Sequence, residues 1–236
     1  MDGSGRHMGG TGSGEGFWQR LSETDQALLR ATGSLAHYRS GAVICTEGEP
    51  ATHVFILMTG WVKVIAVTRD GREFVLALRG QGDIIGELGE VSGYRTASVL
   101  AVDEVRSLLI QRAKFDGFLS AHADANREYR RLVTQRWGQA NSTLLSRSTT
   151  TGAQRLADML LDLAQRHGIV SAGQVDIEMP LSQEELASFV GTSRSTLTRA
   201  LDGWRRRGFI QTSYRRITIT DADSLRRIAH RSPPGA

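Results

Sequence analysis

The chain has 236 residues, 40% of them hydrophobic and 23% charged, a composition that suits two modest globular domains. The formal net charge of +4 is unevenly spread, because residues 127–236 hold 17 arginines and 10 acidic residues whereas residues 1–126 are net acidic. There is no long apolar run, no leader pattern and a single cysteine, Cys45, so we expect a cytoplasmic protein with no membrane span, no intrachain disulfide and no multi-cysteine iron–sulfur cluster.

The N-terminal part predicts a tail, a helix and a β domain, in that order. Residues 1–16 are mostly Gly, Ser and Thr, which predicts a disordered tail, and residues 17–32 have a helical pattern with a second helical start near Ser22. Residues 38–110 contain short apolar or alternating runs separated by Gly-rich turn signals. This pattern predicts a β jelly roll within residues 17–123 and an α+β fold class for the whole chain.

Two short motifs within the β domain indicate a ligand site. Gly86-Glu87-Leu88 is followed by Arg95-Thr96-Ala97, and we call these two motifs together the cassette. Backbone N–H groups of a Gly-containing turn suit an anion, an Arg–Thr pair binds phosphate, and a carboxylate accepts hydrogen bonds from a ribose hydroxyl. The alternative interpretation is a β-turn closed by an ordinary Glu87–Arg95 salt bridge.

Residues 124–147 predict a long helix between two domains. A stripe along this helix steps by four, three and four residues, which is typical of a coiled-coil seam and predicts a homodimer. The seam consists of Val133, Trp137, Ala140 and Leu144. Leu132 and Tyr129 widen the stripe toward the β domain.

Residues 148–231 predict a winged helix-turn-helix domain. After a helix over residues 151–167, residues 181–201 contain a capping box, Ser182 with Glu185, and a glycine turn at Gly191. Thr192 or Ser193 then caps a second helix whose exposed face carries Arg and Ser/Thr side chains suited to DNA base edges. The predicted DNA-binding residues are Thr192, Ser193, Arg194, Ser195, Thr196 and Arg199. Residues 209–219 predict a β-hairpin wing whose tip, Tyr214 to Arg216, could touch phosphates.

With these motifs in this order, residues 17–228 resemble the Crp/Fnr family of bacterial transcription regulators. The resemblance implies no catalytic residues and no metal. It implies an allosteric homodimer that binds a double-stranded DNA operator and RNA polymerase and is controlled by a cyclic nucleotide, with cyclic AMP the first candidate. The implied cyclic-nucleotide-binding residues are Gly86, Glu87, Leu88, Arg95, Thr96, Asn141 and Ser142.

The sequence departs from the family pattern at two functional positions. Ser195 stands where the family usually has a base-reading Glu, and Ala140 replaces a polar purine contact. The alternatives are a family regulator with another effector or none, such as cyclic GMP, cyclic di-GMP or haem bound by Cys45 with His37 or His53. A jelly-roll metal enzyme is a further alternative, but no two of the six histidines lie within ten residues of each other.

Overall fold

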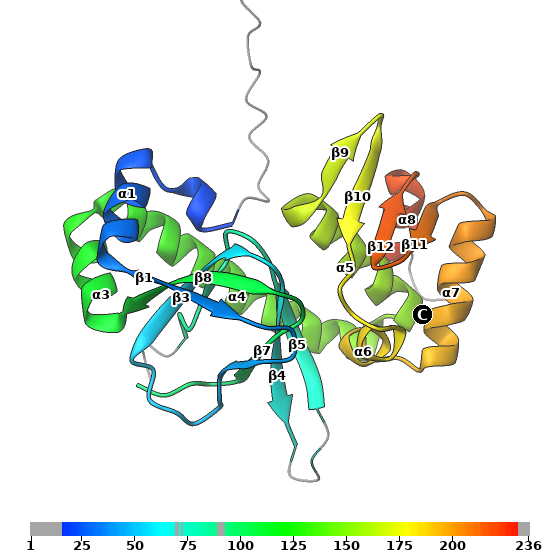
Figure 1. Ribbon diagram of the computed structural model, residues 1–236. Coiled ribbons are helices and arrows are strands. Elements are labelled where there is room, and N and C mark those ends of the chain that lie inside the picture. The colour runs from blue at the N-terminus through cyan, green and yellow to red at the C-terminus, as the bar shows by residue number, and fades with distance from the viewer. Residues whose placement is uncertain (1–15, 69–70, 72, 89–92, 231–236) are drawn as a thin grey trace, which may run out of the picture.

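The computed structural model describes residues 16–68, 71, 73–88 and 93–230, and for residues 141–148 it describes only the backbone. Figure 1 shows two lobes, a β domain and a C-terminal domain, with helix α4 leading from the first to the second. The predicted α+β class is confirmed. The predicted tail lies almost entirely outside the described residues.

The β domain is a sandwich of two antiparallel sheets, as predicted. The strands lie in the orders β1-β8-β3-β6 and β2-β7-β4-β5, and the sheets pack face to face over a shared apolar layer. The strands are β1 (Ser34–Tyr38), β2 (Val43–Cys45), β3 (His53–Thr59), β4 (Val62–Val67), β5 (Glu73–Arg79), β6 (Ile84–Ile85), β7 (Ser98–Ala101) and β8 (Val105–Gln111).

Helices cover one side of this sandwich. They are η1 (Trp18–Arg20), α1 (Glu23–Thr32), α3 (Arg112–Ala121) and α4 (Ala123–Thr149). The predicted helix over residues 17–32 is divided, because Leu21 is extended and Ser22 caps α1 by accepting a hydrogen bond from the Asp25 backbone N–H. Tyr129 and Leu132 of α4 are buried in the core beneath these helices, which confirms that this side of α4 faces the β domain.

The C-terminal domain packs four helices against a small antiparallel sheet of order β11-β12-β10-β9. Its elements are α5 (Gly152–His167), β9 (Ile169–Ser171), β10 (Gln174–Glu178), α6 (Gln183–Phe189), α7 (Arg194–Arg206), β11 (Ile210–Ser213), β12 (Arg216–Ile219) and α8 (Ala222–Ala229). Both predicted hairpin strands are present, whereas β9, β10 and α8 were not predicted. In the described part of the chain no helix is long and apolar enough to cross a membrane.

The two domains are in direct contact. Trp61 and Leu78 of the β domain belong to the same buried cluster as the core of the C-terminal domain. The indole Nε1 of Trp61 donates to Glu178 Oε2 at 3.1 Å, and Lys63 Nζ lies 2.7 Å from Glu185 Oε1. We call this arrangement the docked arrangement.

Candidate functional site

Gly86 and Arg95 form the centre of the cassette. Gly86 follows β6 with a φ of +87°, and a Cβ atom there would lie 2.2 Å from Arg95 Nη1, so only glycine fits against this guanidinium. Arg95 is 7% exposed, and its Nη2 donates to the His53 carbonyl at 2.8 Å. Its Nη1 is buried with no hydrogen-bond partner. Burial lowers the pKa of Arg95, and an anion bound there would supply the missing partner.

Glu87 is held by an arginine of α4. The Arg136 guanidinium donates from Nη1 to Glu87 Oε1 and, at 2.7 Å, to the Ile84 carbonyl, while its Nη2 donates to Asp83 Oδ1 at 3.2 Å. All three charged side chains are buried. Burial alone would lower the pKa of Arg136, but the carboxylates of Glu87 and Asp83 outweigh it and raise that pKa. The alternative interpretation of a Glu87–Arg95 salt bridge is therefore wrong, because Glu87 pairs with Arg136.

A second arginine lies beside the same glycine. Arg112, the first residue of α3, donates from Nη2 to the Gly86 carbonyl, and its Nε and Nη1 are buried without hydrogen bonds. Its positive charge also contributes to the lowered pKa of Arg95. The guanidinium groups of Arg95 and Arg112 thus both lie against Gly86, which favours an anionic ligand there. The sequence pattern did not identify Arg112 or Arg136, because Arg136 reads as an ordinary polar position on a helix and Arg112 lies in a stretch for which no helix was predicted.

The remaining predicted ligand residues are less enclosed. Leu88 and Thr96 are exposed at the surface of the cassette. Asn141 and Ser142 lie in α4, and their side chains are outside the described part of the structure. Of the predicted ligand residues, Gly86 and Arg95 are thus in direct contact and Glu87 is held by Arg136, while the purine contacts stay a prediction.

The predicted seam of α4 presents a large apolar side chain to solvent. Trp137 is 61% exposed, and Ala140 is also exposed. Val133 is half-buried and packs in part against the β domain. The side chain of Leu144 is not among those that the structure describes. Most of the Trp137 side chain is therefore accessible on this surface of α4.

The helix-turn-helix forms with the local geometry that the sequence predicts. Ser182 and Glu185 make a reciprocal capping box at the start of α6, and Gly191 has a φ of +65° in the turn. Arg155 of α5 fastens this turn, donating from Nε to the Val190 carbonyl at 2.6 Å and from Nη2 to the Gly191 carbonyl at 2.7 Å. Arg155 was not predicted as a functional residue.

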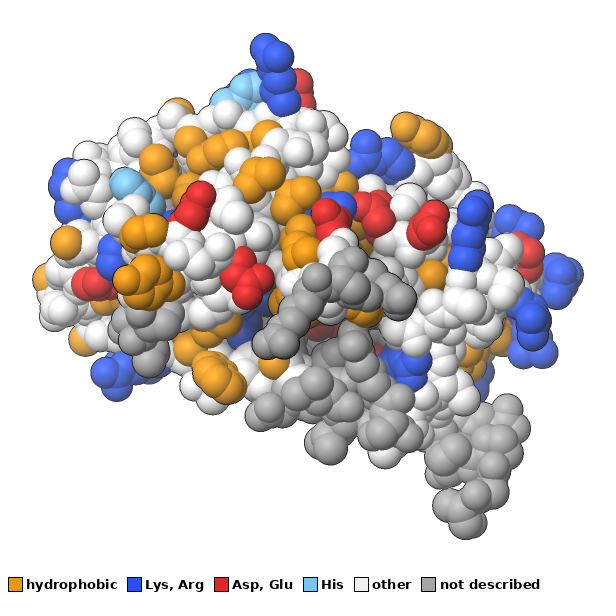
Figure 2. Space-filling view, turned by 90° about the horizontal axis from the view of Figure 1, so that it is seen from below, with side chains coloured by type: hydrophobic (Ala, Val, Ile, Leu, Met, Phe, Trp, Pro, Cys, Tyr) orange, Lys and Arg blue, Asp and Glu red, His pale blue; other side chains and the backbone are white. Residues whose placement is uncertain are grey.

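The front of α7 is open to solvent. Ser193 is its N-cap and accepts a hydrogen bond from the Thr196 backbone N–H at 3.2 Å, so Ser193 and Thr196 form the cap. Arg194, Ser195 and Arg199 are exposed, whereas Thr192 is half-buried. Figure 2 shows many Lys and Arg side chains over the right-hand part of the molecule, where the C-terminal domain lies. This surface is suited to the edges and phosphates of a DNA duplex.

The tip of the wing turns toward the β domain in the docked arrangement. Arg215, with a φ of +53°, has its Nη2 4.0 Å from Asp103 Oδ2. A hollow of about 200 Å³ lies beside this pair and is lined by Asp103, Glu178, Pro180, Tyr214, Arg215 and Arg216. The predicted phosphate contact of Arg215 therefore competes with this ion pair, whereas Tyr214 is exposed.

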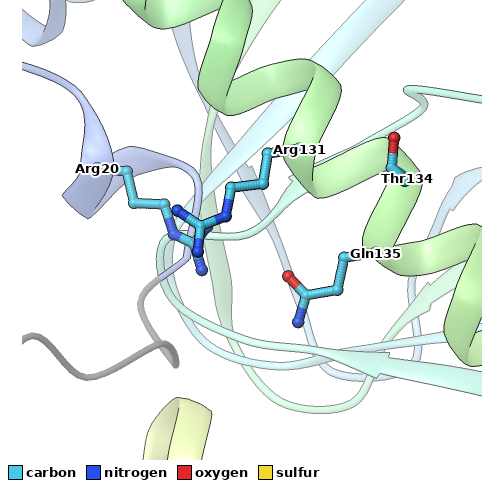
Figure 3. Close-up of a pocket in the computed structure, with 4 residues that line it drawn as sticks. All are labelled: Arg20, Arg131, Thr134 and Gln135. Atoms are coloured by element: carbon cyan, nitrogen blue, oxygen red, sulfur yellow. The ribbon is translucent and has the colours of Figure 1, made fainter.

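A larger hollow of about 410 Å³ lies between η1 and α4 (Figure 3). Arg20, Arg131, Thr134 and Gln135 line it. Arg20 Nη1 lies 3.5 Å from Glu128 Oε2, which ties η1 to α4. Within the described residues, no group of three His, Cys, Asp or Glu side chains is arranged to hold a metal ion.

Comparison with known proteins agrees with this architecture. Residues 35–122 match the cyclic nucleotide-binding domain, and residues 154–228 match the Crp-like helix-turn-helix domain. A CRP-like cAMP-activated global transcriptional regulator of Mycobacterium tuberculosis is 31% identical over 215 residues, which cover 91% of this chain and 96% of that protein.

Solved structures share the fold. FixK2 from Bradyrhizobium japonicum superposes with a TM-score of 0.74 at 22% identity, covering 86% of this chain and 99% of that one. The c-di-GMP responsive global regulator CLP of Xanthomonas campestris has a TM-score of 0.65 at 21% identity, covering 84% of this chain and 99% of that one. With both domain matches and the relative at 31% identity, the chain belongs to the Crp/Fnr family of DNA-binding transcription regulators and carries a cyclic nucleotide-binding domain.

Proposed function

We propose that this regulator binds a cyclic nucleotide at the cassette and that the ligand controls its affinity for an operator. The observation that carries the proposal is the buried Arg95 guanidinium, whose Nη1 lies against Gly86 without a hydrogen-bond partner. A cyclic phosphate would supply both an acceptor and a counter-charge there, while Thr96 adds a hydroxyl donor. Glu87, fixed by Arg136, is the acceptor for a ribose hydroxyl.

Cyclic AMP is the effector that we propose first, because the relative at 31% identity is named as cAMP-activated. The fold alone does not determine the effector, since the Xanthomonas regulator of the same fold responds to cyclic di-GMP. The buried Nη1 of Arg95, which has no hydrogen-bond partner, favours an anionic effector over a ligand-independent regulator.

We propose that the protein acts as a homodimer through α4. The exposed Trp137, with Ala140 one turn further on, is the surface that a second copy would cover. Two copies would present two α7 helices to successive major-groove segments of one duplex. Membership of the family supports RNA polymerase as the partner at the promoter.

Within each α7, we propose that Arg194 and Arg199 read guanine edges, which bidentate arginines recognise at about 1–3 kcal/mol each. Ser195 has no carboxylate to accept a hydrogen bond from cytosine N4, so we expect an operator that differs from the family consensus at that base pair.

Calorimetric titration of the full chain with cyclic AMP, cyclic GMP and cyclic di-GMP tests the effector. We expect saturable binding of cyclic AMP, its loss in Arg95→Ala, and its retention in Arg39→Ala, which removes an exposed arginine of the same domain. Binding of only one of the other nucleotides would reassign the effector. Binding of cyclic AMP by Arg95→Ala with unchanged affinity would contradict the assigned site.

A further inference from the structure

Arg95 and Arg112 approach Gly86 from two sides. Arg95 Nη1 lies where a side chain at Gly86 would begin, and the Gly86 carbonyl accepts a hydrogen bond from Arg112 Nη2. The backbone N–H of Arg112 donates to the Thr52 carbonyl at 2.8 Å. The next carbonyl along the chain, that of His53, accepts from Arg95 Nη2. Both arginines are thus anchored at the cassette turn and at the start of β3, and we call them the arginine pair.

The arginine pair has buried polar atoms without partners. Nη1 of Arg95 and both Nε and Nη1 of Arg112 are buried and make no hydrogen bond. Arg95 is 7% exposed, and the Arg112 side chain is 14% exposed. Burial lowers the pKa of Arg95, and the positive charge of Arg112 acts in the same direction. An anion in contact with both groups would satisfy these donors and offset the repulsion between the two cations.

The neighbouring carboxylates do not take the place of this anion. Glu87 is held by Arg136, as described above. Asp116 Oδ1 lies 3.8 Å from Arg112 Nη1 without a hydrogen bond, and the Asp116 side chain is 46% exposed, so this contact is weak. Within the residues that the structure describes, Arg95 makes no ion pair. The arginine pair therefore keeps an excess of buried positive charge.

Helix stability does not account for an arginine at position 112. Arg112 is the first residue of α3, and the first turn of this helix contains no acidic residue. The dipole of a helix disfavours a cation at its N-terminus and favours an anion there. The charge of Arg112 and the dipole of α3 therefore act together to attract an anion to this side of Gly86.

We propose that Arg112 is a second phosphate-binding residue of the cassette, so that different guanidinium groups bind the two exocyclic oxygens of a cyclic phosphate. Arg95 binds one oxygen through Nη1, and Arg112 binds the other through its free N–H groups. The negative charge of a phosphodiester is shared by both oxygens, so one phosphate serves both cations. The identity of the ligand rests on the proposed function. The arginine pair adds a selectivity for anions whose two oxygens are both unblocked.

Phosphorothioate analogues of cyclic AMP address the two oxygens separately. In the Rp and Sp analogues, sulfur replaces one or the other exocyclic oxygen, and sulfur is the weaker hydrogen-bond acceptor. Calorimetry of the full chain should show weaker binding of both analogues than of cyclic AMP. An analogue that binds the unsubstituted chain as tightly as cyclic AMP would overturn the proposal without any substitution.

Substitution of Arg112 then identifies the oxygen that it binds. Arg112→Gln removes the charge, while the Gln amide can still donate to the Gly86 carbonyl. Binding of cyclic AMP should weaken at least about tenfold, as expected for the loss of one hydrogen bond between charged groups. The analogue with sulfur on the Arg112 side should now bind as tightly as cyclic AMP, and the other analogue should still bind more weakly. Arg95→Gln should show the opposite preference between the analogues.

A residue that only supports the fold would not change this preference. Equal weakening of cyclic AMP and of both analogues in Arg112→Gln would overturn the proposal, because it would assign Arg112 a structural effect alone. Arg39→Gln, which removes an exposed arginine of the same domain, is the control and should leave all three affinities unchanged.

Inorganic phosphate separates this inference from the proposed function. Absence of cyclic AMP binding would overturn the effector assignment, and thermal unfolding in sodium phosphate or in sodium chloride of equal ionic strength would then decide the arginine pair. Phosphate should raise the unfolding midpoint, because an anion that binds the folded state stabilises it. The rise should be smaller in Arg112→Gln and in Arg95→Gln than in Arg39→Gln. An equal rise in Arg112→Gln and Arg39→Gln would overturn the role of Arg112.

Discussion

Lys63 Nζ and Glu185 Oε1 lie 2.7 Å apart and join strand β4 to the first helix of the helix-turn-helix. Glu185 also forms the capping box of α6 with Ser182. Burial alone would raise the pKa of Glu185, but the hydrogen bonds from Lys63 and Ser182 outweigh burial and lower that pKa.

A lowered pKa gives this contact a defined pH dependence. The stabilisation is present above the ordinary glutamate pKa of 4.5 and is lost as the pH falls through the lower pKa of the folded protein. Lys63→Met should therefore reduce the docked population at pH 7, and acidification through the lowered pKa of Glu185 should remove the difference between the variant and the unsubstituted chain. Energy transfer between a donor and an acceptor dye on cysteines introduced by Arg39→Cys and Arg206→Cys, both exposed sites, measures both effects. A docked population equal to that of the unsubstituted chain at pH 7 would show that the ion pair does not hold the domains together.

Removal of Arg136 should be costly for stability. Arg136→Leu leaves Glu87 and Asp83 as buried carboxylates without their cation, and breaking a buried pair in this way costs about 3–5 kcal/mol. Urea unfolding followed by circular dichroism gives the free energy of unfolding. Arg131→Leu, an exposed position on the same helix, is the matched control and should change that value by less than about 0.5 kcal/mol. Equal values for the two variants would contradict the buried pairing.

The dimer prediction rests on Trp137. Trp137→Glu places a charge on the proposed seam and should convert dimers to monomers, as measured by sedimentation equilibrium. Gln135→Glu adds the same charge on a different face of α4, about 160° around the helix, and should leave the oligomeric state unchanged. Monomers in the unsubstituted chain at micromolar concentration would rule out this interface.

Arg155 should support DNA binding indirectly, because it holds the turn that precedes α7. Arg155→Ala removes two charged hydrogen bonds to the turn at Val190 and Gly191, each worth about 1.5–3 kcal/mol, so the turn should loosen and DNA affinity should fall at least tenfold. Arg226→Ala breaks only an exposed ion pair with Asp223 and should leave DNA affinity unchanged. Fluorescence anisotropy on an operator selected from random DNA provides the readout.

The sequence predicts most accurately those features that depend on interactions between residues close together in the chain. The capping box of Ser182, the turn at Gly191 and the cap of Ser193 depend on residues within a few positions of each other, and all three are present. The β sandwich was predicted from alternating runs, whereas β9 was not, because all of its three residues are exposed and give no alternation.

Long-range pairings could not be predicted in the same way. Arg136 lies 49 residues from Glu87 and 53 from Asp83, and on a polar helix it reads as a solvated side chain until the fold buries it. The same applies to Arg155, whose carbonyl partners lie 35 and 36 residues away. The cassette was predicted by its residue types, but its pairing was not, because Arg95 and Arg136 are both plausible partners for Glu87 on charge alone.

The central claim is that a cyclic nucleotide held by Arg95 controls DNA binding, and one measurement tests it most directly. Anisotropy titrations of the selected operator, with and without saturating cyclic AMP, should give dissociation constants that differ by a factor of about 5–150 for the unsubstituted chain. For Arg95→Ala the two constants should be equal. Equal constants with and without cyclic AMP for the unsubstituted chain, in a preparation that binds the operator, would contradict the account.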